Sequence, residues 1–234
     1  MERSELISIR LKLLNRQLPS NRNVSLVAVS KKYPIEDIKF AYDTGQTEFG
    51  ENRVDELVEK SAQAQERNLN ITWHFIGNLQ SNKISKLLAV PNLKFIHSID
   101  SYSLLSKLYD NESVLNDKLG FFLQIKTSDE KEKSGFDSYD ELSKAINLIF
   151  KHENSKLQFQ GLMTMSKVRT DNFEEDARLC FRKLKNIQKQ LQQDFGVGKL
   201  HLSMGMSSDY QYALEEGSDV LRLGSSIFAL EVRD

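Results

Sequence analysis

Cysteine is nearly absent from this chain, since Cys180 is the only one among 234 residues. A single thiol cannot form a disulfide within the chain or supply a cysteine-based metal site. The surrounding segment, Arg178-Leu-Cys-Phe-Arg182, is typical of the buried stripe of a helix. We therefore expect Cys180 to be a core residue rather than a nucleophile.

The chain also has no excess of either charge, with 32 basic and 33 acidic side chains. No overall field would attract nucleic acid or an anionic membrane, so a small molecule or a local anion site is the better expectation. No apolar run approaches the roughly 20 residues of a membrane span, and the acidic start after Met1 lacks the core of a secretory signal. We predict a soluble, cytoplasmic protein that is a monomer.

Proline is scarce, with three in the chain, and no Ser/Gly-rich linker, low-complexity tract or acidic tail is present. The length is close to the roughly 250 residues of a complete (β/α)8 barrel, although two small domains would also fit. The missing linker favours one domain over residues 1–234, with an additional helix at the N-terminus.

Short β-branched or aromatic runs alternate with longer segments of helical periodicity, which is typical of βα units around a parallel sheet. After a predicted helix over Glu2–Gln17 come eight predicted strands: Val24–Ser30, Thr47–Phe49, Thr72–Ile76, Phe95–Ile99, Phe121–Ile125, Phe159–Met163, Lys199–Ser203 and Val220–Leu223. The clearest predicted helices between them are Pro34–Thr44, Arg53–Arg67, Tyr139–Lys151 and Phe173–Phe195. Eight such units predict an α/β fold closed as a TIM barrel, with its site at the carboxyl ends of the strands.

Two lysines, Lys31 and Lys32, follow the first predicted strand directly. The period of two puts them on opposite faces, but strands of a closed parallel barrel are apolar on both faces, so the pattern does not say which lysine points inward. A lysine at a barrel mouth can act as an amine nucleophile when burial and nearby cations lower its pKa. The alternative is a pair of solvated lysines.

The last two predicted strands end in similar turns, Leu202-Ser-Met-Gly-Met-Ser207 and Leu221-Arg-Leu-Gly-Ser-Ser226. Backbone amides, hydroxyls and a helix N-terminus in such turns can bind phosphate, and TIM barrels often place a phosphate there. Each turn taken alone fits a simple helix cap equally well. Arg222 should share the inner face of its strand, where either a ligand or an internal salt bridge to Glu48 or Glu51 would satisfy it.

The four histidines, His74, His97, His152 and His201, lack the close spacing of a metal pair, and we predict core or surface positions and no metal site. The charged segment from Thr127 to Gly135 fits either a solvated loop or part of the barrel mouth.

In their order along the chain, five motifs resemble the pyridoxal phosphate homeostasis protein family (YggS/PROSC). They are Val27-Ala-Val-Ser-Lys31, Glu48-Phe-Gly-Glu-Asn52, Trp73-His-Phe-Ile-Gly-Asn-Leu-Gln-Ser-Asn-Lys83, Leu202-Ser-Met-Gly-Met-Ser207 and Arg222-Leu-Gly-Ser225. The resemblance spans nearly the whole chain, and the third and fourth motifs are long and specific.

The resemblance implies a barrel like the N-terminal domain of alanine racemase that binds pyridoxal 5′-phosphate (PLP) as an internal aldimine on Lys31. By the same likeness Arg222 would face the pyridine nitrogen and Asn52 would lie near the ring. The phosphate would be surrounded by Ser203, Met204, Ser207, Gly224 and Ser225. The family's Lys-Ser-Gly loop carries additional charge here, and Lys133 is a candidate for a second, weaker aldehyde site.

An arginine does not protonate the pyridine nitrogen as a carboxylate would, so it leaves a weak electron sink. In alanine racemase the second acid-base residue comes from a further C-terminal domain, and after the eighth unit this chain leaves no room for one. We therefore expect a protein that carries and buffers PLP, with apo-enzymes as its recipients, rather than an efficient enzyme. The alternatives are a low-activity amino-acid racemase or transaminase, and a sugar-phosphate aldolase or isomerase without PLP.

Overall fold

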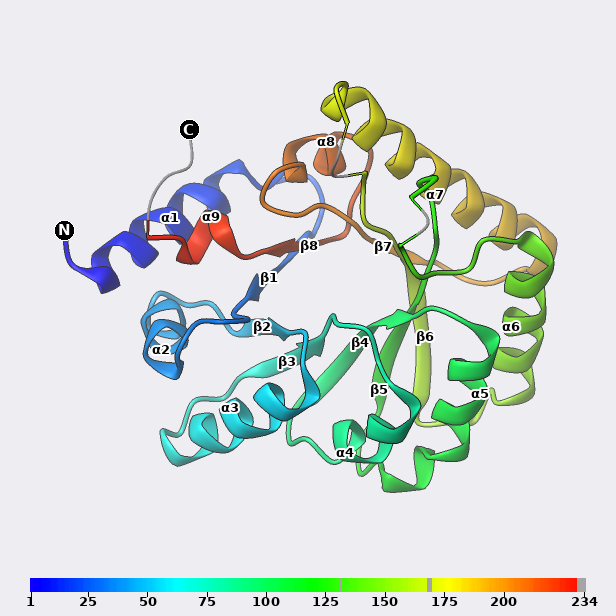
Figure 1. The fold of residues 1–234 in the computed structure, drawn as a ribbon, viewed down its shortest axis with the longest axis horizontal. Coiled ribbons are helices and arrows are strands. Elements are labelled where there is room, and N and C mark those ends of the chain that lie inside the picture. Colours follow the sequence, from blue (N-terminus) through cyan, green and yellow to red (C-terminus); the bar gives the residue numbers. More distant parts are fainter. Residues whose placement is uncertain (131, 168–169, 231–234) are drawn as a thin grey trace.

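A closed barrel of eight parallel strands forms the centre of the computed structural model, which describes residues 1–130, 132–167 and 170–230 (Figure 1). The strands are β1 (Ser25–Val29), β2 (Glu48–Glu51), β3 (Thr72–Phe75), β4 (Leu93–Ile99), β5 (Leu119–Gln124), β6 (Leu157–Met163), β7 (His201–Ser203) and β8 (Val220–Leu223). Each pairs with the next in sequence, and β1 pairs with β8 to close the barrel. The predicted fold class is thereby confirmed.

Helices surround the barrel as its outer layer (Figure 1). They are α1 (Arg3–Gln17), α2 (Ile35–Asp43), α3 (Val54–Glu66), α4 (Ile84–Leu88), α5 (Tyr102–Asp110), α6 (Tyr139–Lys151), α7 (Phe173–Phe195), α8 (Tyr210–Glu215) and α9 (Ser225–Phe228), with short 3-10 turns at Ser81–Lys83 and Glu112–Val114. No helix within these described ranges is long and apolar enough to cross a membrane.

The first helix, α1, lies beside α9 across the β1–β8 seam (Figure 1). Arg3 donates to the backbone oxygen of Phe228 at 2.7 Å and also pairs with Asp37 of α2. Arg10 donates to the backbone oxygens of Ile227 and Ala229. The additional N-terminal helix therefore joins the two ends of the barrel sequence.

The strand register separates an inner face from an outer face. Val27 lies opposite Arg222, and Val29 lies opposite Gly50. Val29 and Arg222 both border the cavity at the barrel mouth, so these positions are on the inner face. Residues of the opposite parity, such as Ser30 and Glu51, face the helical layer, where Ser30 Oγ donates to Glu51 Oε1 at 2.6 Å.

Candidate functional site

A cavity of about 570 Å³ opens where the carboxyl ends of β1, β2, β3, β6, β7 and β8 meet. It is lined by Val29, Lys31, Lys32, Tyr33, Asn52, Ile76, Gly77, Met163, Met165, Met206, Ser207, Ser208, Arg222, Gly224 and Ser225. Among these described residues are three cationic side chains and no acidic one. The cavity therefore favours an anionic ligand with an apolar body.

Lys31 and Lys32 occupy the two central positions of a turn in which the amide of Tyr33 donates to the carbonyl of Ser30 at 3.0 Å. Lys32 has φ of 69°, a left-handed conformation that is costly for a residue with a side chain. Both side chains are exposed and border the cavity. The turn thus places two amines at the mouth, which strand alternation alone did not predict.

The turn is attached to the helical layer through a buried network behind β1. Lys60 of α3 donates to the carbonyl of Ser30 at 2.8 Å and to Glu51 Oε1 at 2.7 Å. Burial raises the pKa of the Glu51 carboxyl, whereas the charge of Lys60 lowers it. The end of β1 is fixed by these contacts, and the position of Lys31 is fixed with it.

Asn52 follows β2 and is held by a close backbone approach. A Cβ built on Gly77 would lie 1.9 Å from the carbonyl oxygen of Asn52, so no residue larger than glycine fits there without moving this segment. The carbonyl of Gly77 also accepts a hydrogen bond from the buried Ser98 hydroxyl. This packing explains why a glycine follows the third strand.

Two backbone amides converge on one oxygen atom at the end of β8. The amides of Gly224 and Ser226 both donate to Ser207 Oγ, each at 3.1 Å. Gly224 is also close-packed, since a Cβ there would lie 3.2 Å from the carbonyl oxygen of Val29. The β7 and β8 turns therefore form a joint polar cradle, which fits the requirements of a phosphate group.

Arg222 lies on the inner face of β8 and is only 5% exposed. Its guanidinium donates to Ser203 Oγ at 2.7 Å and to the carbonyl of Thr164 at 2.9 Å. Within the described residues it forms no ion pair with Glu48 or Glu51, which was the alternative for this residue. Burial lowers the pKa of Arg222 to about 10, while the charge of Asp209 raises it, so the side chain remains cationic at neutral pH.

The predicted site residues divide into two groups. Those that line the cavity are Lys31, Asn52, Ser207, Arg222, Gly224 and Ser225. Ser203 and Met204 are fully buried beneath it, where Ser203 contacts Arg222 and Met204 packs in the core. Their predicted place around a phosphate stays a prediction.

Several lining residues were not predicted, notably Tyr33 and the methionines Met163, Met165 and Met206. Met206 is part of the quoted β7 motif, and Tyr33 follows Lys32 directly. Met163 and Met165 lie at the carboxyl end of β6, and this position is the feature of the sequence that could have placed them at the cavity.

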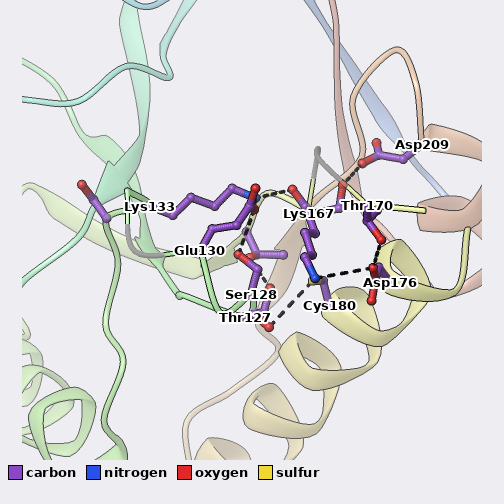
Figure 2. Close-up of polar contacts among 12 residues, drawn as sticks. Thr127, Ser128, Glu130, Lys133, Lys167, Thr170, Asp176, Cys180 and Asp209 are labelled. Carbon is purple, nitrogen blue, oxygen red and sulfur yellow. Dashed lines mark hydrogen bonds and ion pairs between the residues drawn. The ribbon is translucent and has the colours of Figure 1, made fainter. Parts of the chain in front are cut away.

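The segment from Thr127 to Gly135 contacts the loop after β6 (Figure 2). Lys133 forms an ion pair with Glu130 and donates to the backbone oxygen of Ser166, whose hydroxyl in turn donates to Asp209. Buried Cys180 lies beside this segment, with its sulfur 3.7 Å from the carbonyl of Thr127. The described part of this loop is therefore packed against the loop after β6, although none of its described residues lines the mouth cavity, and Cys180 is a core residue as predicted.

A second cavity, of about 620 Å³, runs along the start of α7 and is lined by both acidic and basic side chains. Its Arg178 already pairs with Glu174, Glu215 and Glu216. No group of three or more potential metal ligands occurs among the described residues. The mouth cavity is therefore the better candidate for function.

A barrel with lysines after β1 and a polar cradle after β7 and β8 defines the class of alanine racemase N-terminal domains. The family model "Alanine racemase, N-terminal domain" matches residues 6–232. Solved alanine racemases share the fold, such as that of E. faecalis, with a TM-score of 0.72 and 16% identity over 97% of this chain and 58% of the racemase.

Relatives identify the family within this class. The pyridoxal phosphate homeostasis protein of Schizosaccharomyces pombe is 38% identical over 91% of this chain and 86% of its own length. The human protein of the same name is 37% identical over 87% and 75%. PipY of Synechococcus elongatus PCC7942, solved with PLP bound, has a TM-score of 0.85 and 33% identity over 95% of this chain and 100% of PipY. The chain belongs to the pyridoxal phosphate homeostasis protein family.

Proposed function

We propose that this protein binds PLP in the mouth cavity and holds it for release to other proteins. The observation that carries the proposal is the lining of the cavity, which combines three cations with apolar side chains and, among the described residues, no carboxylate. PLP has an anionic phosphate, an apolar ring and an aldehyde, so its parts match the cradle, the methionines and the lysines. Homologous PipY, which has been solved with PLP bound, supports the same ligand.

Lys31 is the proposed attachment point. Its neutral Nζ would attack the aldehyde carbon, so that a C=N bond forms and one water molecule leaves. The turn brings both amines to the cavity, and the choice of Lys31 rests on the family resemblance, in which the first lysine of the pair forms the imine. Lys32 and Arg222 would keep the cavity electropositive, which favours the anionic phosphate of the ligand.

The remaining contacts follow from the cradle and from Arg222. A phosphate oxygen would replace Ser207 Oγ as the acceptor for the amides of Gly224 and Ser226, and the hydroxyls of Ser207 and Ser225 would donate to the phosphate. Arg222 would face the pyridine nitrogen as a donor and Asn52 would lie beside the ring. Bound PLP can serve as an electron sink, but a guanidinium partner supplies no proton to strengthen that sink.

We propose storage and transfer rather than efficient catalysis. The described lining residues include no histidine and no carboxylate, so Tyr33 and Lys32 are the remaining side chains that could exchange a proton beside the ring, and Arg222 would leave the electron sink weak. Exposed lysines at the mouth leave the attachment point open to solvent and to an acceptor protein. Exchange of the α-proton of alanine in deuterated water, measured against free PLP, tests this part, because exchange far above the free cofactor would indicate a racemase instead.

Visible absorption of the PLP-loaded protein tests the attachment. Wild type and Lys32→Ala should both show the band of a PLP imine, and Lys31→Ala should lose it. Reduction with borohydride followed by peptide mass spectrometry should find the pyridoxyl group on Lys31. The same digest shows whether Lys133 is a second site. A band that persists in Lys31→Ala would contradict the assignment.

A further inference from the structure

A line of hydrogen-bonded side chains crosses the barrel interior beneath Arg222. Ser203 Oγ lies 2.8 Å from His97 Nδ1, and His97 Nε2 lies 2.9 Å from His74 Nδ1. His74 Nε2 faces Glu48 Oε2 at 3.9 Å. The line begins at Glu48, the first residue of β2, and ends at Ser203, the last residue of β7, so it connects the floor of the barrel with the site.

The directions of the hydrogen bonds in this line follow from Arg222 and from the burial of Ser203. A guanidinium only donates, so Ser203 Oγ accepts from Arg222. If Ser203 also accepted from His97, its buried hydroxyl hydrogen would have no acceptor among the described contacts, so Ser203 is assigned as the donor to His97 Nδ1. His97 then carries its proton on Nε2 and donates to His74 Nδ1. His74 in turn carries its proton on Nε2, directed at Glu48.

Both imidazoles are suited to this neutral arrangement. Burial lowers the pKa of His74 to about 3 and lowers that of His97 well below its ordinary value, with His74 and Arg222 acting in the same direction on His97. His74 stacks on Phe95 at 4.7 Å between ring centroids, and His97 stacks on Phe122 at 4.5 Å. Stacking fixes the planes of both rings, so the donors and acceptors stay aligned.

At the Glu48 end of the line, one hydrogen bond is missing between His74 and the carboxylate. His74 Nε2 is buried and has no hydrogen-bond partner, although a carboxylate lies just beyond hydrogen-bonding distance. A buried N–H is normally paired, and a small movement of Glu48, whose side chain is 31% exposed, would pair it. The charged groups at the two ends are thus Glu48 and Arg222, with Asp209 also acting on Arg222.

We infer that Ser203, His97, His74 and Glu48 form a positioning relay that orients the Arg222 guanidinium toward the bound ligand. Glu48 polarises His74, which polarises His97, and Ser203 becomes a stronger acceptor for Arg222. The four residues act through Arg222, since none of them lines the cavity. This inference deepens the proposed function and rests on it for the identity of the ligand, PLP.

The first test needs no cofactor. Ring nitrogen chemical shifts of 15N-labelled apo-protein should show His74 and His97 as neutral Nε2–H tautomers, with unprotonated Nδ1 atoms. In Glu48→Gln the His74 shifts should move and those of His97 should move less. A proton on His97 Nδ1, or His74 chemical shifts that are the same in wild type and Glu48→Gln, would overturn the relay.

The second test measures PLP affinity and the position of the visible band at a fixed pH. Glu48→Gln should weaken binding about three- to tenfold and move the band, since it keeps the shape but removes the charge. Asp219→Asn is the matched control, because it removes a carboxylate at the same end of the barrel whose oxygen accepts from the amide of Leu202, outside the relay. Its affinity should stay within about twofold of wild type.

His97→Asn is a second variant in case Glu48→Gln folds poorly. Its amide oxygen can still accept from Ser203 but cannot reach His74, so it should reproduce the band shift of Glu48→Gln. Unchanged bands and affinities in both variants would exclude the relay while leaving PLP binding intact. A wild type without any PLP band would instead contradict the proposed function, and the apo-protein shifts would still decide the relay.

Discussion

Two buried cations in this barrel, Lys60 and Arg222, differ in whether a carboxylate is in contact with them. Lys60, in the layer between β2 and α3, has the carboxylate of Glu51 at 2.7 Å. Arg222, inside the barrel below the mouth, donates to the hydroxyl of Ser203 and the carbonyl of Thr164, and within the described residues the charge of Asp209 acts on it without a direct ion pair. A buried charge without a counter-ion in direct contact is unfavourable for folding, so the difference supports the proposal that Lys60 serves the scaffold and Arg222 a ligand.

Removal of the Lys60 counter-ion tests the structural half of this contrast and should have the largest effect. Glu51→Gln leaves a lysine that is 11% exposed without a compensating charge. We expect the free energy of unfolding to fall by about 3–5 kcal/mol in urea titrations. The control is Asp43→Asn, which breaks the exposed pair with Lys39 and should cost less than about 0.5 kcal/mol. Equal small losses in both variants would mean that the buried pair does not stabilise the fold.

Acid should destabilise the protein through the neutral imidazoles inside the barrel. The pKa of His74 is about 3 in the folded state against 6.5 ordinarily, so the unfolded chain binds more protons between these values. Stability is therefore complete above about pH 6.5 and falls by about 1.4 kcal/mol per pH unit for each such imidazole as the pH drops.

The carboxyl of Glu48 contributes with the opposite sign. Burial raises its pKa, so its contribution is present at low pH and is lost as the pH rises through the folded-state pKa. Denaturant titrations of wild type and His74→Gln between about pH 6.5 and 4 measure the balance. The variant should show the shallower slope, and identical slopes would show that His74 titrates normally.

Replacement of Arg222, the buried cation without an ion pair among the described residues, tests the ligand-binding half of this contrast. Arg222→Met should weaken PLP binding about ten- to a hundredfold, because a charge-assisted hydrogen bond to the ring is lost. Its stability should change less than that of Glu51→Gln, since within the described residues no carboxylate is in direct ion-pair contact with Arg222. Equilibrium dialysis with PLP and urea unfolding provide the two values, and a loss of stability as large as that of Glu51→Gln would remove the distinction between the cations.

The smallest predicted effect is a gain in stability at the mouth. Lys32→Gly relieves the left-handed backbone at φ of 69° and should raise the free energy of unfolding by up to about 1 kcal/mol. PLP affinity should fall modestly, because one of the three cations that line the cavity is lost while Lys31 and Arg222 remain. Thermal unfolding and dialysis measure both quantities. A destabilised variant would mean that the Lys32 side chain itself contributes to the fold.

Much of the barrel is predictable from the sequence because strand and helix periodicities are local properties. β8, α6 and α7 have the predicted bounds, and the other strands differ by two residues or fewer at each end. The cavity residues Lys31, Arg222 and Gly224 are predictable for the same reason, since each follows or ends a strand.

Features that depend on the register between strands were not predictable. His74 and His97 lie 2.9 Å apart, yet their strands are offset by a register shift that neither sequence segment encodes alone. The choice between Lys31 and Lys32 likewise depends on a turn held by Lys60, a residue of a later helix. Such long-range contacts arise only when the barrel is closed.

The seam between β1 and β8 also has a consequence for folding. Its pairs, such as Val27 with Arg222, join the first and last strands, so they impose one of the largest loop-closure entropies in the chain. Lys31 and the Gly224 cradle belong to opposite sides of this seam. A ligand that contacts both sides of the seam would bind only the closed barrel and would therefore slow separation of β1 from β8. The exchange rate of bound PLP would then depend on how often this seam opens.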